Sequence, residues 1–340
     1  MNNLLSSIYL IDGVEKELTP AALLGEDETP GEGRITDESI DPAPGLLDVN
    51  ADRLYEYLNL VMGAKMSFPV PFAADYSRAL VAEALIDSLW RQGNFRLDDL
   101  SLTLKWVWNL DTLGAGAAFY SSVEAIADYI DAMRLNIRRY SVEQGPLSFK
   151  VTTPFSGAPL LLPSALDPDP QSWIIYIPFD SSPHRLGGSL LSQVLGPGGG
   201  VSPAVSDADY FMDCFELVRE LVEDEVAVSG ATVREGGLLK ALKRMSSTGT
   251  GADIDLSPLL KGGDRRELVR VGFSEVPGVL LQIRDFDFDY IDAECLLQDI
   301  ACFPLGHPIC GSDDLLVRGS AQSGIQRILD SLVQNAEGED

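Results

Sequence analysis

The stretch from Val226 to Met245 constrains the fold most strongly, because it predicts a strand that ends in glycines and continues into a helix. A short β-branched run is interrupted at Gly230, and Gly236 and Gly237 then precede apolar residues at helical spacing. Such a helix N-terminus presents backbone N–H groups that can bind a phosphate. The same glycines also suit a turn that only needs positive φ, which is the preferred interpretation for one such turn taken alone.

The charge of the chain limits its partners. The 340 residues carry a formal net charge of −27, which argues against binding to DNA, RNA or an anionic membrane, because each of these requires basic protein surface. With 45% hydrophobic residues, the chain is expected to be globular. Neither a signal peptide nor an apolar run of about 18 residues is present, so we expect a reducing, aqueous compartment and no secretion.

The cysteines and histidines give only a weak metal signal. The four cysteines form no Cys-x-x-Cys pair, and the chain has two histidines. Cys302, His307 and Cys310 lie close in sequence and could bind a metal, but their apolar neighbours favour an ordinary core.

The remaining pattern alternates strands with helices and predicts a layered α/β fold. Ser101–Trp108 has the clearest strand pattern, because Leu102, Leu104, Trp106 and Trp108 alternate with more polar residues. The other predicted helices span residues 75–90, 117–134, 207–225 and 291–301. The other predicted strands span residues 147–153, 173–179, 269–273 and 278–283, and a final strand and helix fall within 315–333. The alternation in Asp285–Tyr290 predicts aromatics on one face and carboxylates on the other, with calcium binding disfavoured.

Two carboxylates on the first long predicted helix face the same way. Glu83 and Asp87 are four residues apart, a spacing at which like charges repel each other. A bound Mg²⁺ would turn this repulsion into a binding site. A solvated acidic helix face explains the same pattern equally well.

Several segments match one enzyme family in the same order, and the chain resembles the second PurM-like half of formylglycinamide ribonucleotide amidotransferase (FGAM synthase). The matching segments are 81–85, 100–106, 185–189 with 193–195, 229–230 with 236–238, and 273–278, within a span of about 61–333. The resemblance implies a PurM-like N-terminal domain with a barrel-forming sheet and a PurM-like α/β C-terminal domain. The predicted divisions are an acidic extension over 1–55, domains over 56–180 and 181–334, and a tail over 335–340.

The resemblance also implies a structural nucleotide site with Mg²⁺. The matching positions are Gly187, Gly188, Ser189, Gly236 and Gly237 for the nucleotide, and Glu83, Asp87 and Glu235 for the metal. The chain departs from the family in two of its motifs. Glu143–Ser148 lacks the lysine and aspartate of the family's Gly-Lys-Asp-Ser, and Gly230–Gly237 lacks the histidine and one aspartate of Gly-His-Asp-x-Ser-Asp-Gly-Gly. We therefore expect vestigial sites and no cofactor, with residual Mg²⁺ or ADP left open.

A PurM-like chain that keeps its core pattern but loses its polar pocket is similar to gammaherpesvirus tegument proteins, which are degenerate homologues of FGAM synthase. This similarity implies a non-catalytic protein-interaction scaffold in the virion tegument and the host nucleus or cytoplasm, directed at host defence proteins such as components of PML nuclear bodies. The N-domain sheet is expected to self-associate or pair with another PurM-like domain. The alternative is a genuine FGAM synthase half in purine biosynthesis. A stand-alone PurM-like kinase or synthetase is disfavoured, because residue 145 has no phosphate-binding lysine beside it.

Overall fold

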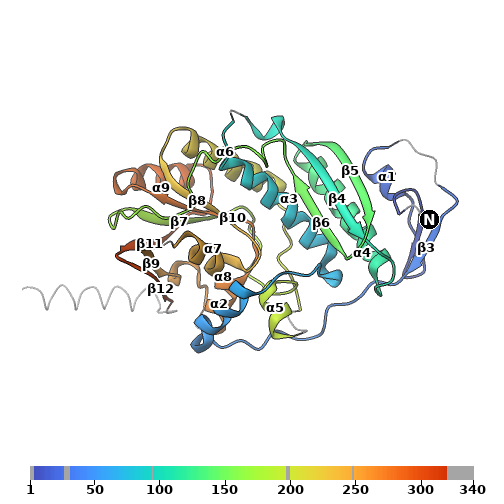
Figure 1. Ribbon diagram of the computed structural model, residues 1–340, viewed down its shortest axis with the longest axis horizontal. Helices are drawn as coiled ribbons and strands as arrows, with labels where there is room; N and C mark the ends of the chain where they lie inside the picture. Colours follow the sequence, from blue (N-terminus) through green and yellow to red (C-terminus); the bar gives the residue numbers. More distant parts are fainter. Residues whose placement is uncertain are drawn as a thin grey trace, which may run out of the picture.

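The computed structural model describes residues 4–26, 31–93, 95–196, 200–246, 249–262 and 264–319. Figure 1 shows the six-stranded sheet and the three-stranded sheet β5-β4-β6 side by side, with a small N-terminal sheet beyond them, next to the N-terminus. The small sheet has the order β2-β1-β3 and is formed by Ile8–Ile11 (β1), Val14–Glu15 (β2) and Arg34–Asp37 (β3). The short helix α1 (Pro20–Leu23) connects β2 to β3 in the sequence. Tyr9 of β1 packs against Phe119 and Tyr120. Within the predicted acidic extension, the described residues from Ile8 to Asp37 therefore include folded elements that pack against α4 (Ala115–Ala132).

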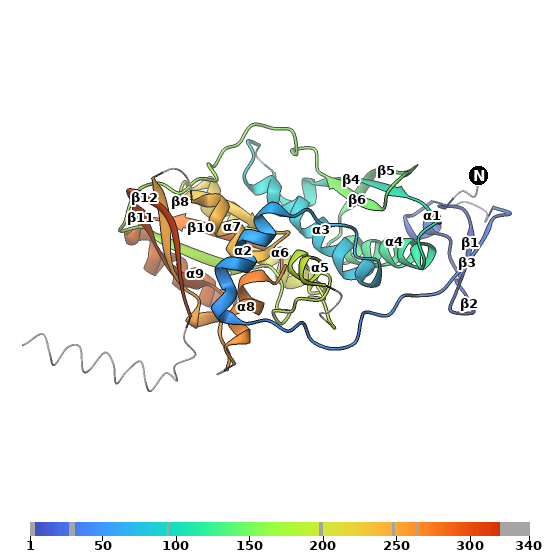
Figure 2. The ribbon, with the colours of Figure 1, turned by 60° about the horizontal axis from the view of Figure 1, so that its bottom comes forward.

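The N-terminal domain contains an open three-stranded sheet of order β5-β4-β6. Its strands are Ser101–Trp108 (β4), Asn136–Gln144 (β5) and Ser148–Thr152 (β6). In β4 every second residue is buried, as its alternating sequence predicts. Helices α3 (Ala73–Leu89) and α4 (Ala115–Ala132) lie on one side of this sheet, below it in Figure 2.

The C-terminal domain is built on a six-stranded sheet of order β12-β9-β11-β7-β10-β8. The strands are Trp173–Pro178 (β7), Ala227–Val233 (β8), Thr250–Asp255 (β9), Gly278–Ile283 (β10), Phe303–Cys310 (β11) and Ser312–Arg318 (β12). The helices around it are Leu54–Gly63 (α2), Leu190–Leu195 (α5), Ala208–Glu223 (α6), Gly237–Met245 (α7), Arg266–Phe273 (α8) and Phe288–Leu297 (α9). β7 pairs with β10 and β11, so a domain boundary at residue 180 separates β7 from its own sheet.

The two faces of the six-stranded sheet belong to two cores. Ile175 and Ile177 of β7 face a core that includes α3, α4 and α6. Ile174 and Tyr176 face the opposite core, to which α2, α7 and α8 contribute. Because α6 packs with the N-domain helices, the first core runs without a break from one domain into the other.

Two local predictions are wrong. Residues 269–273 are the end of helix α8 and not a strand, because Leu268, Val269 and Val271 pack into the core that α7 also enters. Their β-branched character is overridden by this packing. Residues 285–290 form a 3₁₀ turn and the start of α9, so the alternating aromatics and carboxylates do not lie on a strand. The predicted closing helix up to 333 and the tail 335–340 lie outside the described residues.

Candidate functional site

The two glycine turns predicted to hold a nucleotide meet at one carboxylate. Oε1 of Glu275 accepts hydrogen bonds from the backbone N of Leu190, at 2.8 Å, and of Gly236, at 2.7 Å. Leu190 is the first residue of α5, and Gly236 is the cap of α7. The structure thus brings Gly187, Gly188, Ser189, Gly236 and Gly237 into one neighbourhood. An internal anion already binds backbone donors there that a phosphate would use.

These glycines also have packing roles. A Cβ at Gly187 would lie 2.3 Å from the backbone carbon of Val201, and one at Gly237 would lie 2.7 Å from the backbone of Phe273. Gly237 has φ of 74°, a conformation that disfavours any side chain. Ser189 caps its own helix, because its hydroxyl accepts from the backbone N of Ser192 at 3.3 Å. Close packing and capping are therefore sufficient to explain this part of the sequence.

The carboxylates predicted to hold a metal lie close together, but two of them are bound to cations of the chain. Oδ1 of Asp87 accepts from the hydroxyl of Thr232 at 2.5 Å and from Nη2 of Arg234 at 3.1 Å. Thr232 accepts in turn from the indole N–H of Trp90 at 2.8 Å. Thr232 and Arg234 stand in the motif where the family has an aspartate and a serine, so the two departures from the family create this hydrogen-bonded network.

Glu235 is neutralised from within α7. Nζ of Lys240 lies 2.9 Å from Oε1 of Glu235, and the Lys240 side chain is only 2% exposed. The stem of Lys240 also covers Gly236, since a Cβ there would lie 2.2 Å from Cδ of the lysine. A buried ammonium needs such a partner, so the Lys240–Glu235 pair is part of the fold. The sequence prediction missed both Lys240 and Arg234, although Lys240 lies only five residues after Glu235.

Glu83 and Glu275 have raised pKa values. Burial raises the pKa of Glu83 well above its usual range, and the carboxylates of Glu275, Asp87 and Glu235 add to this while Arg234 opposes it. Burial also raises the pKa of Glu275 to about 7, against the opposing effect of its two backbone hydrogen bonds. Burial is the largest cause of the raised pKa for both carboxyls. The cluster therefore favours a proton on at least one carboxyl.

No group of three or more His, Cys, Asp or Glu side chains within the described residues is arranged to hold a metal ion. The second metal hypothesis also lacks support, because Cys302, His307 and Cys310 have other neighbours. Nδ1 of His307 lies 2.9 Å from the Ser172 carbonyl oxygen, and Sγ of Cys310 donates to the Pro168 carbonyl at 3.1 Å.

A separate cavity of about 780 Å³ lies in the C-terminal domain, between the loop after β7 and helix α8. His184, Arg185, Lys261 and Arg270 line it together with apolar side chains. Nε2 of His184 is buried without a partner among the described residues. Burial, with a smaller effect of Lys261, lowers the pKa of His184 to about 4, so this imidazole is neutral at pH 7. Arg185 and Leu186 of the matching segment 185–189 line this cavity, but the sequence analysis predicts no site there.

Comparison with known proteins finds relatives that are similar to this chain in sequence. The chain is 24% identical over 266 residues to human phosphoribosylformylglycinamidine synthase, matching 73% of this chain and 19% of the human protein. It is 23% identical over 252 residues to the probable chloroplastic/mitochondrial enzyme of Arabidopsis thaliana, matching 68% of this chain and 17% of that protein. The chain therefore spans about a fifth of the length of the curated relatives that it matches. No protein-family model matches it.

The fold has a similar counterpart among solved structures. PurLQS from Thermotoga maritima aligns with a TM-score of 0.53 and 16% identity, covering 75% of this chain and 41% of that one. These similarities support an α/β, PurM-like domain related to FGAM synthase, as the sequence motifs predict. No described helix is both long and apolar enough to cross a membrane.

Proposed function

We propose that this FGAM synthase-related domain acts through protein contacts and does not catalyse a reaction. The main observation behind the proposal is that the Asp87 carboxylate already accepts hydrogen bonds from Thr232 and Arg234. A metal or nucleotide phosphate at this place would have to displace the arginine and part of the hydrogen-bonded network. The pairing of Lys240 with Glu235 supports the same conclusion for the third predicted metal ligand.

The binding free energy lost with the family's missing polar residues supports weak or absent nucleotide binding. Each lost hydrogen bond to a charged group costs about 1.5 to 3 kcal/mol. The chain lacks the family's lysine and aspartate before β6, so at least two such contacts are missing. Since about 1.4 kcal/mol corresponds to a factor of ten in affinity, the loss amounts to several orders of magnitude.

A thermal-shift titration of the purified chain with ATP, ADP and MgCl₂ tests this proposal. A ligand that binds only the folded state raises its stability, so no shift at millimolar nucleotide is expected. NaCl at matched ionic strength controls for screening of the acidic surface, and mass spectrometry detects nucleotide carried through purification. A shift at micromolar nucleotide, or bound ADP in the purified protein, would overturn the proposal.

The N-domain sheet is part of the proposed contact surface. The face of β4 away from α3 and α4 carries Ser101, Thr103, Lys105 and Val107, all partly exposed, and Lys105 pairs with Glu143 of β5 at 2.7 Å. We propose that this face contacts a second copy or another PurM-like domain. Sedimentation velocity over a concentration series tests self-association, with Lys105→Glu expected to weaken it.

The proposed setting is a virion tegument and an infected host cell, with host defence proteins such as PML nuclear-body components as partners. The chain keeps the PurM-like fold but lacks polar residues of the family's pocket, and this combination supports the assignment. Microscopy of the tagged chain in human cells, with PML as a marker, tests it. Unchanged PML bodies and no co-localisation would contradict it.

A second candidate is a genuine half of FGAM synthase with a structural nucleotide and Mg²⁺. The match to the human and plant enzymes over more than 250 residues favours this candidate. It predicts bound nucleotide and restored purine synthesis when the missing parts of the enzyme are supplied.

A further inference from the structure

Helix α9 exposes apolar side chains on the face that points away from the molecule. Phe286 is 78% exposed, Tyr290 52% and Leu297 79%. Tyr290 and Leu297 share one face of α9 with Ala293, which is also exposed, and Phe286 lies just before the helix, in the 3₁₀ turn Asp285–Asp287. Leu296, 80% exposed, lies beside them.

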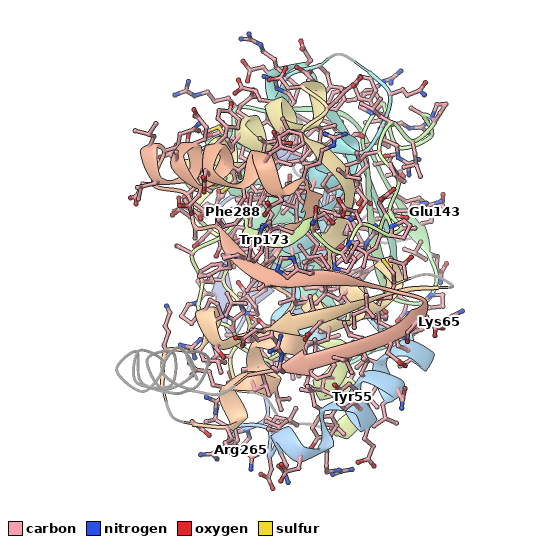
Figure 3. The ribbon with its side chains drawn as sticks, turned by 90° about the vertical axis from the view of Figure 1, so that its left-hand side faces the viewer. Tyr55, Lys65, Glu143, Trp173, Arg265 and Phe288 are labelled. Atoms are coloured by element: carbon pink, nitrogen blue, oxygen red, sulfur yellow. The ribbon has the colours of Figure 1, made fainter. Side chains whose placement is uncertain are left out.

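The opposite face of α9 is the one that holds the helix on the protein. Ile291 and Cys295 are buried in the core, and Phe288 packs on Trp173 with ring centroids 4.9 Å apart. Figure 3 shows Phe288 and Trp173 close together, with α9 crossing the side of the molecule turned to the viewer. The helix is therefore apolar on two faces but buried on one of them.

An ordinary surface helix of the same protein shows the contrast. In α6 the apolar residues, such as Phe211 and Leu221, are buried, and the exposed positions carry acids such as Asp213 and Glu220. The outer face of α9 therefore has the composition of an interface.

The surroundings of this face are mainly acidic. Residues 284–299 contain six acidic residues and one arginine, Arg284, which lies 6.0 Å from the ring centroid of Phe286 and 3.9 Å from the carboxylate of Asp287. The acids are Asp285, Asp287, Asp289, Asp292, Glu294 and Asp299. Partial desolvation and the nearby carboxylates of Glu294, Asp224 and Glu220 raise the pKa of Tyr290, which places the acidic side of α6 next to the same patch.

We propose that the α9 patch, defined as Phe286, Tyr290, Ala293, Leu296 and Leu297 with the acids around them, binds a basic amphipathic protein segment. Its apolar face would cover the exposed stripe, and its lysines or arginines would meet the surrounding carboxylates. This inference rests on the proposed function as a protein-contact module and names the class of partner. A second copy does not fit the patch, because two surfaces would be brought together that each carry six acids and one arginine over residues 284–299.

The test uses a fluorescein-labelled 14-residue helical peptide of leucine and lysine, with leucines at i, i+3, i+4 and i+7, and the whole 340-residue chain. Fluorescence anisotropy measures its affinity. A peptide of the same composition in scrambled order controls for charge attraction alone, and one with glutamate in place of lysine controls for apolar contact alone. The ordered basic peptide is expected to bind at least tenfold more tightly than either.

Two matched pairs of variants locate the binding. Phe286→Ser with Leu297→Ser is expected to weaken binding at least tenfold, whereas Leu46→Ser with Leu113→Ser, at leucines 69% and 77% exposed elsewhere, leaves it unchanged. Asp289→Asn with Asp292→Asn is expected to weaken binding more than the distant pair Asp111→Asn with Asp128→Asn. All four replace exposed residues, so circular dichroism should show an unchanged fold.

Three results of the peptide-binding measurements would overturn the inference. These are failure of the ordered peptide to bind, equal binding of the scrambled peptide, and equal effects of the α9 and control variants. Loss of a dimer in sedimentation on the Phe286 and Leu297 changes would assign the patch to self-association and also reject it. The nucleotide titration is independent of all these measurements, so failure of the proposed function can be distinguished from failure of this inference.

Discussion

Nη2 of Arg234 lies 3.1 Å from Oδ1 of Asp87, and this ion pair joins the turn after β8 to helix α3. The arginine lies among carboxylates that the family resemblance assigns to Mg²⁺. It supplies from within the chain a positive charge at the place where the resemblance implies a metal ion. Because the Arg234 side chain is 43% exposed, the pair contributes little to stability, but it offsets the charge of Asp87.

Replacing Arg234 should therefore make the protein sensitive to Mg²⁺. For Arg234→Ser we expect a loss of about 1 kcal/mol in the free energy of unfolding without divalent ions, as for an exposed ion pair. Millimolar MgCl₂ should then raise the melting temperature of the variant but not that of the wild type, because Glu83, Asp87 and Glu235 are left less compensated. Arg284→Ser, which changes a surface arginine outside the cluster, is the control, and an equal Mg²⁺ response in both variants would reject the expectation.

The Lys240–Glu235 pair should respond unequally to removal of its two partners. Glu235→Ala leaves the buried ammonium of Lys240 without its partner and should cost about 3 kcal/mol of unfolding free energy. Lys240→Met keeps the length of the side chain and leaves a carboxylate that is 36% exposed to water, so the cost should be about 1 kcal/mol or less. Urea unfolding measures both. Glu56→Ala, at an exposed ion pair, should have no measurable effect, and equal losses in the first two variants would contradict the burial argument.

Glu275 should make stability depend on pH. Its pKa of about 7 in the folded protein lies above the usual value of 4.5, so the folded state binds the extra proton. The contribution of Glu275 to the free energy of unfolding is fully present below pH 4.5 and is lost as the pH rises to about 7. The loss is about 3 kcal/mol on the scale of 1.36 kcal/mol for each pH unit.

The variant Glu275→Gln isolates this contribution, since its amide oxygen can still accept from Leu190 and Gly236. The difference in unfolding free energy between wild type and variant should change across pH 4.5 to 7. The comparison is needed because His184, with its pKa lowered to about 4, acts in the opposite direction as the pH falls below 6.5. A constant difference over this range would show that Glu275 is not protonated there.

Gly237 should tolerate no side chain. Its φ of 74° and the Phe273 backbone at 2.7 Å predict a loss of about 3 kcal/mol for Gly237→Ala, from backbone strain and overpacking together. Gly249 has φ of 88° but no atom within 4 Å of an added Cβ, so Gly249→Ala should cost only the strain, about 1 kcal/mol. Thermal unfolding of both variants checks the difference, and equal losses would mean that contact with Phe273 is unimportant.

Strong local periodicity explains which elements the sequence predicts. β4 alternates over eight residues, and α7 has a glycine start with apolar residues at helical spacing, so both were predicted close to their observed bounds. Strand β5, Asn-Ile-Arg-Arg-Tyr-Ser-Val-Glu-Gln, is a polar edge strand, and β11 contains Pro304 and Pro308. Neither has a clear two-residue period, and both are held in place by neighbours distant in sequence.

The sequence motifs predict that these residues cluster, but not the electrostatics of the cluster, and their role as a binding site stays a prediction. The motifs identified Glu83, Asp87, Glu235 and the two glycine turns, and the structure brings them together. The roles of Arg234 and Lys240 depend on which carboxylate each side chain reaches after folding, which sequence spacing does not determine. The contact of Glu275 with two helix starts likewise joins segments about 40 and 85 residues away from it.

The unbroken core beneath α6 has a consequence for how this chain can be divided. Tyr129 of α4 and Phe179 after β7 both pack edge-on against Phe211 of α6, so the same ring belongs to the interior of both domains. The long connection between β6 and β7 offers a convenient place to cut the chain, but each fragment would expose half of a hydrophobic interior. The two domains are therefore obligate folding partners, and fragments made there should be recovered as a noncovalent complex when expressed together, and as aggregates when expressed apart.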